Sequence, residues 1–281
     1  MAEAGHLTRP TAAIGWWPGP VMRLRIAIIV SLLVVWEAVA ASGLLLRDVV
    51  PSITVIGGAI FELLTHADLK WPVDVGFGSV RFTHEFLVPS FYWHLYVTIA
   101  EVAAAMVIGG LSGLIVGLLL GGNPFLGQAF ERYLYYLGPT PKIVFFPVMI
   151  MWFGVGPESK VAMGTLSCFF PIALNVAAGM REIDPVLVRV GRSFRLSTSQ
   201  MVRKVYLPAM REPIVNGVRI GMGVALIGTL LAETKLSNKG VGFLIIDSYN
   251  TFDMPRMYAV LAMLFVIAIG ANALLGRASR N

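Results

Sequence analysis

Charge is what this chain has least of. Only 14% of its 281 residues are Asp, Glu, Lys or Arg, whereas a soluble globular domain carries roughly a quarter. Hydrophobic residues make up 57%, and the mean hydropathy is +0.76. This composition excludes a soluble protein and indicates an integral membrane protein. The net charge of +6 does not indicate nucleic-acid binding, because the basic residues follow loop positions rather than one stripe.

Other absences narrow the chemistry. The single cysteine, Cys168, excludes a disulfide within the chain, and its apolar surroundings (TLSCFFPIAL) predict a buried, inert thiol. No GxxxxGK[ST] phosphate loop is present, so the chain does not bind ATP in that manner. The four histidines lack metal-ligand spacing. No GxSxG motif or intramembrane carboxylate pair indicates catalysis. We therefore predict no catalytic residue, no metal site and no directly bound cofactor.

Long apolar runs, by contrast, are abundant, and each clear one is close to the ~20 residues that a helix needs to cross a bilayer. The five clear runs are Ile26–Leu46, Tyr96–Leu120, Val161–Ala178, Ile214–Ala232 and Met257–Leu275. A sixth run, Tyr133–Val155, is interrupted by three prolines and contains Lys142. Composition alone leaves open whether this sixth run crosses.

The first run also has features of a secretory signal peptide, since Arg23 and Arg25 precede it and residues 38–40 (AVA) are similar to a cleavage site. The run is too long for that purpose, and Trp36 and Glu37 interrupt it just before the site. We therefore predict that it is retained as a first transmembrane helix.

Basic residues indicate the orientation. Three N-terminal arginines mark the N-terminus as cytoplasmic, and Arg277 and Arg280 mark the C-terminus likewise. Residues 181–212 hold seven of the 22 Lys and Arg residues and are placed in the cytoplasm too. An even number of crossings must separate this segment from the N-terminus, so the proline-broken run has to cross. The sequence predicts an all-α integral membrane protein with six transmembrane helices and a cytoplasmic helical hairpin between the fourth and fifth spans.

That hairpin is predicted from capping residues. Asp184 followed by Pro185 indicates one helix N-terminus, and residues 197–200 (STSQ) form a capping box that indicates a second. Basic residues and apolar residues such as Leu187 and Phe194 lie on different faces, and such a hairpin cannot lie in hydrocarbon. We predict that it lies at the cytoplasmic surface and contacts a partner.

Glycines recur every fourth residue in the second span, which makes a smooth helix face where another helix can approach closely. These are Gly109, Gly113, Gly117 and Gly121, and the fifth span has Gly217, Gly221 and Gly228. Between the first two spans, residues 49–64 (VVPSITVIGGAIFELL) predict a turn and a short amphipathic helix. Residues 71–86 (WPVDVGFGSVRFTHEF) predict an irregular segment.

Few polar groups lie within or at the edges of the spans. They are Glu37, Glu101, Asn175, Arg219 and Glu233. Such residues are costly in lipid and usually face a partner or a water-filled cavity. The sequence leaves a structural role and a solute contact equally open.

The charged segment resembles the "EAA" loop of type I ABC importer permeases, which inserts into a groove on the ATPase subunit. Val205, Leu207 and Pro208 stand at that loop's spacing, and several longer segments narrow the resemblance to nitrate/sulfonate/taurine/bicarbonate-type permeases. These are VVPSITV (49–55), PTPKIVFFPVMIMWFGVGPESK (139–160), FFPIALNVAAGMREIDP (169–185), GVRIGMGVALIGTLLAE (217–233) and KGVGFLI (239–245). The resemblance covers residues 26 to 276.

The N-terminal part of the loop departs from the family pattern. Arg189, Val190 and Gly191 stand where the family has Glu-Ala-Ala, and Arg195 stands where it has a glycine that turns the chain. Arg195 must make this turn without a glycine's conformational freedom.

The resemblance implies a permease subunit, not an enzyme, that moves a small oxyanion or organic acid delivered by a periplasmic or extracellular binding protein. Two cytoplasmic ABC ATPase subunits, which hold ATP and Mg, drive it. The permease pairs with itself or with a second permease in the lipid of the bacterial inner membrane. The implied coupling residues are Asp184, Arg189, Gly191, Phe194, Arg195, Ser197, Val205, Leu207 and Pro208, and the implied path residues are Asn175, Thr229 and Glu233.

The predicted organisation runs from one cytoplasmic tail to another. Its parts are an N-terminal tail (1–25), a first transmembrane helix (26–46), an external loop with an amphipathic helix (47–92), a type I ABC transmembrane domain (93–276, with the coupling hairpin at 184–207) and a C-terminal tail (277–281). The main alternative is a secondary transporter driven by an ion gradient. It usually needs inverted repeats and intramembrane ionisable residues, and the sequence shows neither clearly.

Overall fold

The computed structural model describes residues 19–43, 49–67, 69–77 and 80–278. Most of the predicted N-terminal tail, residues 44–46 of the first predicted span and the last three residues lie outside the described part. The chain divides into two compact units, Met1–Val55 and Ile56–Asn281, which are considered separately.

The first unit contains α1 (Pro20–Ser42), which confirms the first predicted helix with bounds a few residues earlier. None of its side chains is buried, as suits a helix surrounded by lipid. Glu37, the charged residue in this run, accepts a hydrogen bond of 2.9 Å from the backbone N–H of Ile53, the first residue of α2 (Ile53–Thr65). The carboxylate therefore satisfies a backbone donor at the start of the next helix.

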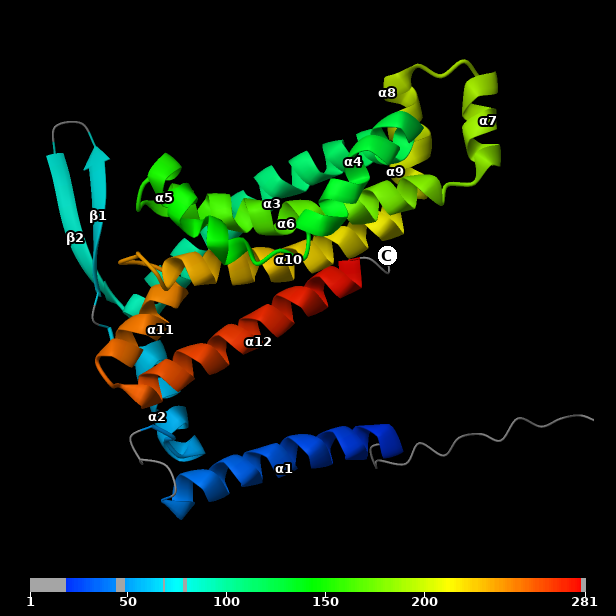
Figure 1. The fold of residues 1–281 in the computed structure, drawn as a ribbon. Helices are drawn as coiled ribbons and strands as arrows, with labels where there is room; N and C mark the ends of the chain where they lie inside the picture. Colours follow the sequence, from blue (N-terminus) through cyan, green and yellow to red (C-terminus); the bar gives the residue numbers. More distant parts are fainter. Residues whose placement is uncertain (1–18, 44–48, 68, 78–79, 279–281) are drawn as a thin grey trace, which may run out of the picture. The chain divides into compact units, whose positions relative to one another are not determined.

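In the second unit, α6 (Pro157–Arg181) lies between α3 (Ser90–Gly122) and α10 (Arg211–Glu233) (Figure 1). The glycine ridge on α3 explains how close α3 comes to α6. A Cβ at Gly117 would lie 2.6 Å from Cβ of Val176, and one at Gly121 would lie 2.5 Å from Cβ of Met180. The glycines of α10 also lie close to α6. The prediction that both glycine series serve helix packing is confirmed.

The proline-broken run forms two pieces, α4 (Pro124–Leu137) and the segment Lys142–Phe153, which comprises a short 3₁₀-helix, η1 (Lys142–Phe145), and α5 (Phe146–Phe153). They meet at 94°. The Lys142 ammonium donates to the carbonyl oxygens of Leu137 (3.1 Å) and Gly138, so it satisfies acceptors at the C-terminus of α4. This explains why a lysine is found inside an apolar run.

Five helices of the described residues are long and apolar enough to cross a membrane, and the bent pair raises the number to six if it counts as one span. The five are α1, α3, α6, α10 and α12 (Met254–Ala278). The all-helical membrane domain is as predicted. The six-span count, which depends on the bent pair, stays a prediction.

At the end of the bundle where α10 terminates, α11 (Val241–Asn250) leads into α12 (Figure 1). An apolar core joins these two helices to α2 and α3. Its buried members are Leu63, Phe91, Val241, Leu244, Ala259 and Val260.

One prediction for the loop between α2 and α3 is wrong. Instead of an irregular segment, β1 (Leu69–Phe77) and β2 (Val80–Val88) form a two-stranded antiparallel hairpin. The sequence carries the signal, because apolar residues alternate with other residues along both strands and a Gly-Ser pair separates them. Trp71 pairs with Phe86 and Phe77 pairs with Val80 in the observed register.

Candidate functional site

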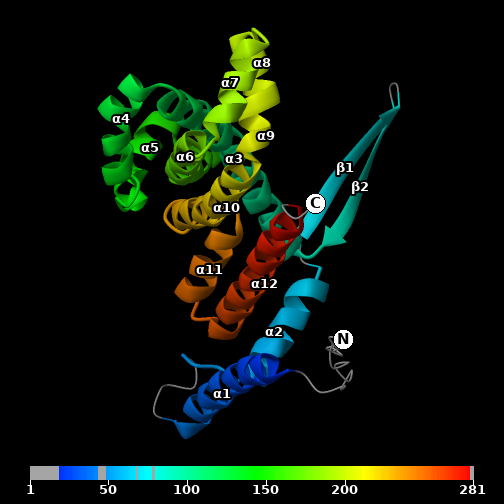
Figure 2. The ribbon, with the colours of Figure 1, turned by 90° about the vertical axis from the view of Figure 1, so that its right-hand side faces the viewer.

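The charged segment projects from one end of the bundle, as Figures 1 and 2 show from two directions. It consists of α7 (Pro185–Ser193), α8 (Thr198–Met201), a five-residue π-helix η2 (Val202–Tyr206) and α9 (Leu207–Ala209). Both predicted helix starts are confirmed. The Asp184 carboxylate accepts from the Val186 N–H at 2.7 Å, and Ser197 and Gln200 form the reciprocal capping box.

Arg195 makes the turn between the two helices. Its φ is +53°, the left-handed conformation in which a side chain costs about 1 kcal/mol or more. The Arg195 N–H donates to the Arg192 carbonyl at 2.9 Å, and the Leu196 N–H donates to the Gly191 carbonyl at 3.2 Å. These two bonds are the Schellman motif, in which glycine usually occupies the left-handed position. The chain thus keeps the turn geometry and accepts the backbone strain of an arginine.

Gly191 allows the two helices of the hairpin to touch. It is buried, and a Cβ there would lie 2.5 Å from Sδ of Met201 and 3.3 Å from Cγ2 of Val205. Farther along, the Leu207 N–H donates to the Val202 carbonyl, five residues back. This wider turn precedes Pro208, which has no N–H to donate.

The hairpin exposes an apolar surface, although it lies outside the spans. Val186, Leu187 and Val190 are each nearly half exposed, and Phe194 is 75% exposed. Arg189 is also exposed and lies on the same helix. An apolar patch bordered by charge on a projecting element is typical of a protein–protein contact.

The three predicted path residues occupy different environments. Asn175 is half-buried on α6. It donates to the Pro171 carbonyl at 2.8 Å and accepts from the exposed Asn216 amide of α10 at 3.0 Å. It therefore links α6 to α10 near a surface of the bundle.

Thr229 and Glu233 are fully buried. The Thr229 side chain lies against Gly164 of α6. Glu233 is hydrogen-bonded to Thr98 of α3 and to the backbone of α11. In this conformation neither side chain is exposed, and their contact with a solute stays a prediction.

The structure also contains a carboxyl pair that we did not expect. Glu101 of α3 and Glu233 of α10 lie at hydrogen-bonding distance from one another, and both are buried. They are far apart in sequence and on different helices, so no local motif indicates the pair. Among the described residues, no group of three or more His, Cys, Asp or Glu could hold a metal ion.

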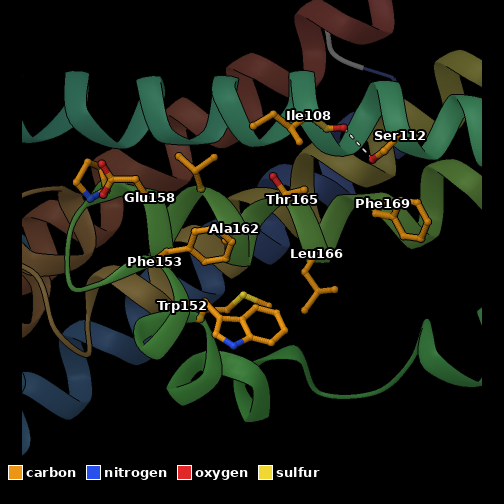
Figure 3. A pocket seen from close by; sticks show the side chains of 12 residues that line it. Ile108, Ser112, Trp152, Phe153, Glu158, Ala162, Thr165, Leu166 and Phe169 are labelled. Atoms are coloured by element: carbon orange, nitrogen blue, oxygen red, sulfur yellow. Dashed lines mark hydrogen bonds between the residues drawn. The ribbon is translucent and has the colours of Figure 1, made fainter.

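A cavity of about 680 Å³ lies beside α6, with α3 and α5 forming its other walls. Figure 3 shows Ile108 and Ser112 of α3, Trp152 and Phe153 of α5, and Leu166 and Phe169 of α6 around it. Glu158 is its one charged lining residue, and the Ser112 hydroxyl already donates to the Ile108 carbonyl at 2.8 Å. The other donors of this wall are the Thr165 hydroxyl, which donates to the Ala105 carbonyl at 3.4 Å, and the Trp152 indole N–H. With no cationic lining residue and an otherwise apolar wall, the cavity suits an anionic solute poorly.

Comparison with known proteins decides the family. The family model "Binding-protein-dependent transport system inner membrane component" matches residues 109–280, which include the charged hairpin and the helices on both sides of it. The chain belongs to this family of permeases. The predicted resemblance is confirmed.

This permease is 30% identical over 226 residues to a Bacillus subtilis (strain 168) protein whose name describes an aliphatic sulfonates transport permease, and 80% of each chain is covered. It is 27% identical over 183 residues to the taurine transport system permease protein TauC of Escherichia coli (strain K12), which covers 65% of this chain and 66% of TauC. Similar relatives are named as permeases for nitrate and bicarbonate.

The fold of the permease is found in solved importers. A structure titled as an inward-facing conformation of the MetNI methionine ABC transporter superposes with a TM-score of 0.59 at 22% identity. The match covers 66% of this permease and 92% of that chain. This likeness shows the fold, whereas the family match and the named relatives show that the chain is a membrane permease subunit of a binding-protein-dependent transport system; those relatives are named as transport permeases rather than enzymes.

Proposed function

We propose that this permease imports a small oxyanion or organic acid, of the nitrate, sulfonate, taurine or bicarbonate kind, delivered by a periplasmic or extracellular solute-binding protein. The names of its relatives support this class of solute. The energy comes from two cytoplasmic ABC ATPase subunits that hold ATP and Mg. A change between inward- and outward-facing states moves the solute.

The observation that carries the proposal is the projecting hairpin α7–α9. Its helix caps and its Schellman turn fix the conformation of the hairpin. Its exposed apolar residues, Phe194 above all, form a surface that a partner protein can cover. In the proposal that partner is the ATPase. The coupling residues Asp184, Ser197 and Gly191 shape the hairpin, whereas Phe194 and Arg189 are exposed on its surface.

We propose that the permease lies in the bacterial inner membrane with both termini and the hairpin in the cytoplasm. The positive-inside distribution supports this orientation. A second permease, either the same chain or a paralogue, completes the pore. Arg189 and Arg195 depart from the family's loop pattern, and this favours a paralogue over a second copy of the same chain. A paralogue can supply a hairpin that keeps the family pattern at these two positions.

The test of the function is solute-stimulated ATP hydrolysis. The permease is co-purified with its ATPase, placed in nanodiscs and mixed with its binding protein and taurine, an alkanesulfonate, nitrate or bicarbonate in turn. One of these solutes should raise the ATPase rate several-fold and should enter vesicles only when ATP is present. Uptake that follows an ion gradient without ATP would instead identify a secondary transporter.

Asn175 is the half-buried member of the three predicted path residues, so its contact with the solute can be tested directly. Replacing Asn175 with leucine removes the amide that Asn216 donates to but keeps the side-chain size. If Asn175 contacts the solute, uptake should fall at least tenfold while basal ATP hydrolysis and complex yield persist. If it serves only to link α6 and α10, yield and every activity should fall together. Asn216→Leu is the matched control, because it breaks the same bond from the other helix.

A further inference from the structure

The first backbone N–H groups of α11 are held by side chains from two spans. The Gly240 N–H donates to Nδ1 of His94 at 3.0 Å, the Val241 N–H to the Thr98 hydroxyl at 2.8 Å, and the Gly242 N–H to the Glu233 carboxylate at 2.7 Å. The first N–H groups of a helix have no partner within it. Here α3 and α10 supply those partners, and a carboxylate at this end also suits the helix dipole.

Thr98 and Glu233 are joined to each other as well. The Thr98 hydroxyl donates to Oε1 of Glu233 at 2.7 Å, and both residues are buried. One connected set of bonds therefore links α3, α10 and the start of α11.

This arrangement explains the two glycines of the KGVGFLI segment. Gly240 has a φ of +98°, and a Cβ there would overlap the Glu233 carboxyl group. A Cβ at Gly242 would lie 2.7 Å from Cβ of Glu233 and 2.7 Å from the Leu230 carbonyl. Only residues without a side chain leave room for the carboxylate at the start of α11.

Glu101 and Lys160 complete the group. Glu101 lies at hydrogen-bonding distance from Glu233. An ionised carboxylate only accepts hydrogen bonds, so two carboxyl groups this close need a hydrogen between them. Glu233 already accepts from Thr98 and Gly242, which favours Glu101 as the donor.

The Lys160 ammonium balances the remaining negative charge. Lys160 is 2% exposed and interacts electrostatically with Glu101, Glu233 and Glu158. Its ammonium donates to the carbonyl oxygens of Val155, of Gly156 at 3.0 Å and of Leu236 at 2.9 Å. It thus ties the start of α6 to the loop between α10 and α11, and a buried charge needs such pairing.

We propose that Glu233, Thr98 and Glu101 are positioning residues: Glu101 donates a hydrogen bond to Glu233, and Glu233 with Thr98 holds α11 so that α3, α10 and α11 move as one body during transport. The apolar core of α11 with α3 and α12 extends this body. The transport part of this inference rests on the proposed function, whereas the hydrogen bonding does not.

The test measures amide hydrogen exchange in peptides covering Gly240–Leu244, with the full complex in nanodiscs. Thr98→Val keeps the side-chain shape and removes the hydroxyl, so exchange should accelerate at least tenfold, while Thr98→Ser should match the wild type. Glu101→Gln keeps a donor for Glu233 and should match the wild type too, whereas Glu101→Leu should accelerate exchange. Glu131→Gln, which alters a buried carboxylate paired with Arg181, is the control and should leave α11 unchanged.

The inference would be overturned if both Thr98→Val and Glu101→Leu exchanged these amides at the wild-type rate. It would also be overturned if Glu101→Gln exchanged them as fast as Glu101→Leu. If Glu101→Leu does not fold, the exchange rates of Thr98→Val, Thr98→Ser and Glu101→Gln still test the inference. For the transport part, Thr98→Val should lower the solute imported per ATP at least threefold with the ATPase still bound; an unchanged ratio would refute movement as one body. If the exchange results are as expected but the wild type shows no ATP-coupled uptake of any solute, the proposed function is refuted and the hydrogen-bonding inference stands.

Discussion

Replacing Phe194 with aspartate should remove the ATPase from the purified permease while the permease itself still inserts and folds. Phe194 is 75% exposed on the hairpin α7–α9, so the substitution removes little packing within the chain. In a docked complex the new carboxylate would be taken out of water, which costs several kcal/mol. That corresponds to an affinity loss of more than about hundredfold. Co-purification of the ATPase and solute uptake should therefore both disappear.

Phe252→Asp is a matched control for this variant. Phe252 is 64% exposed. Its φ is +62°, a backbone conformation that aspartate tolerates well. It lies between α11 and α12, at the other end of the bundle. ATPase recovery should stay at the wild-type level. A Phe194→Asp permease that retains its ATPase would show that this surface is not the docking site. Leu207 is a less decisive position, because it is half-buried within the hairpin.

Replacing Gly117 with leucine should prevent the folded permease from accumulating. A Cβ at this position would lie 2.6 Å from Cβ of Val176 and 2.7 Å from the Ala173 carbonyl. Backbone cannot move aside as a flexible side chain can, so α3 would have to separate from α6 along their contact. Even Gly117→Ala should lower stability by roughly 1–3 kcal/mol. The measurement is monodisperse yield and thermal unfolding in detergent.

Gly110 provides the comparison within the same helix. A Cβ at Gly110 would meet only Cδ1 of Ile172, at 3.9 Å, which is an ordinary contact. Gly110→Ala should be neutral or slightly stabilising, because alanine favours a helix over glycine by up to about 1 kcal/mol. Equal behaviour of the two alanine variants would contradict the role assigned to the ridge.

The spans and the hairpin caps could be predicted because their signals are local. A run of ~20 apolar residues has few alternatives to a transmembrane helix. Asp184 and Ser197 bond to backbone groups two and three residues away, so their role follows from neighbouring letters. The alternation of apolar residues along Leu69–Phe77 and Val80–Val88 is a local signal too, and it indicates the strand pair that the all-helical prediction did not include.

Contacts between distant residues could not be predicted in this way. The sequence shows Glu233 at the end of a span and glycines in KGVGFLI, but not that the carboxylate lies against those glycines. Nor does it show that Glu101 lies beside Glu233 or that Asn175 bonds to Asn216. Each of these pairs joins helices whose rotation and depth are set only when they pack.

From its letters alone, then, this protein is an integral membrane protein with a charged helical hairpin between two spans, because hydropathy, capping and charge act over a few residues along the chain. Its identification as a permease came from the resemblance of its longer motifs to a known family. Only the tertiary structure showed that Glu233 and Thr98 bind the start of α11 and that Phe194 is exposed. The bonds of Glu233 and Thr98 depend on helix–helix geometry, since a polar group in lipid must bond to whichever partner packing brings within reach.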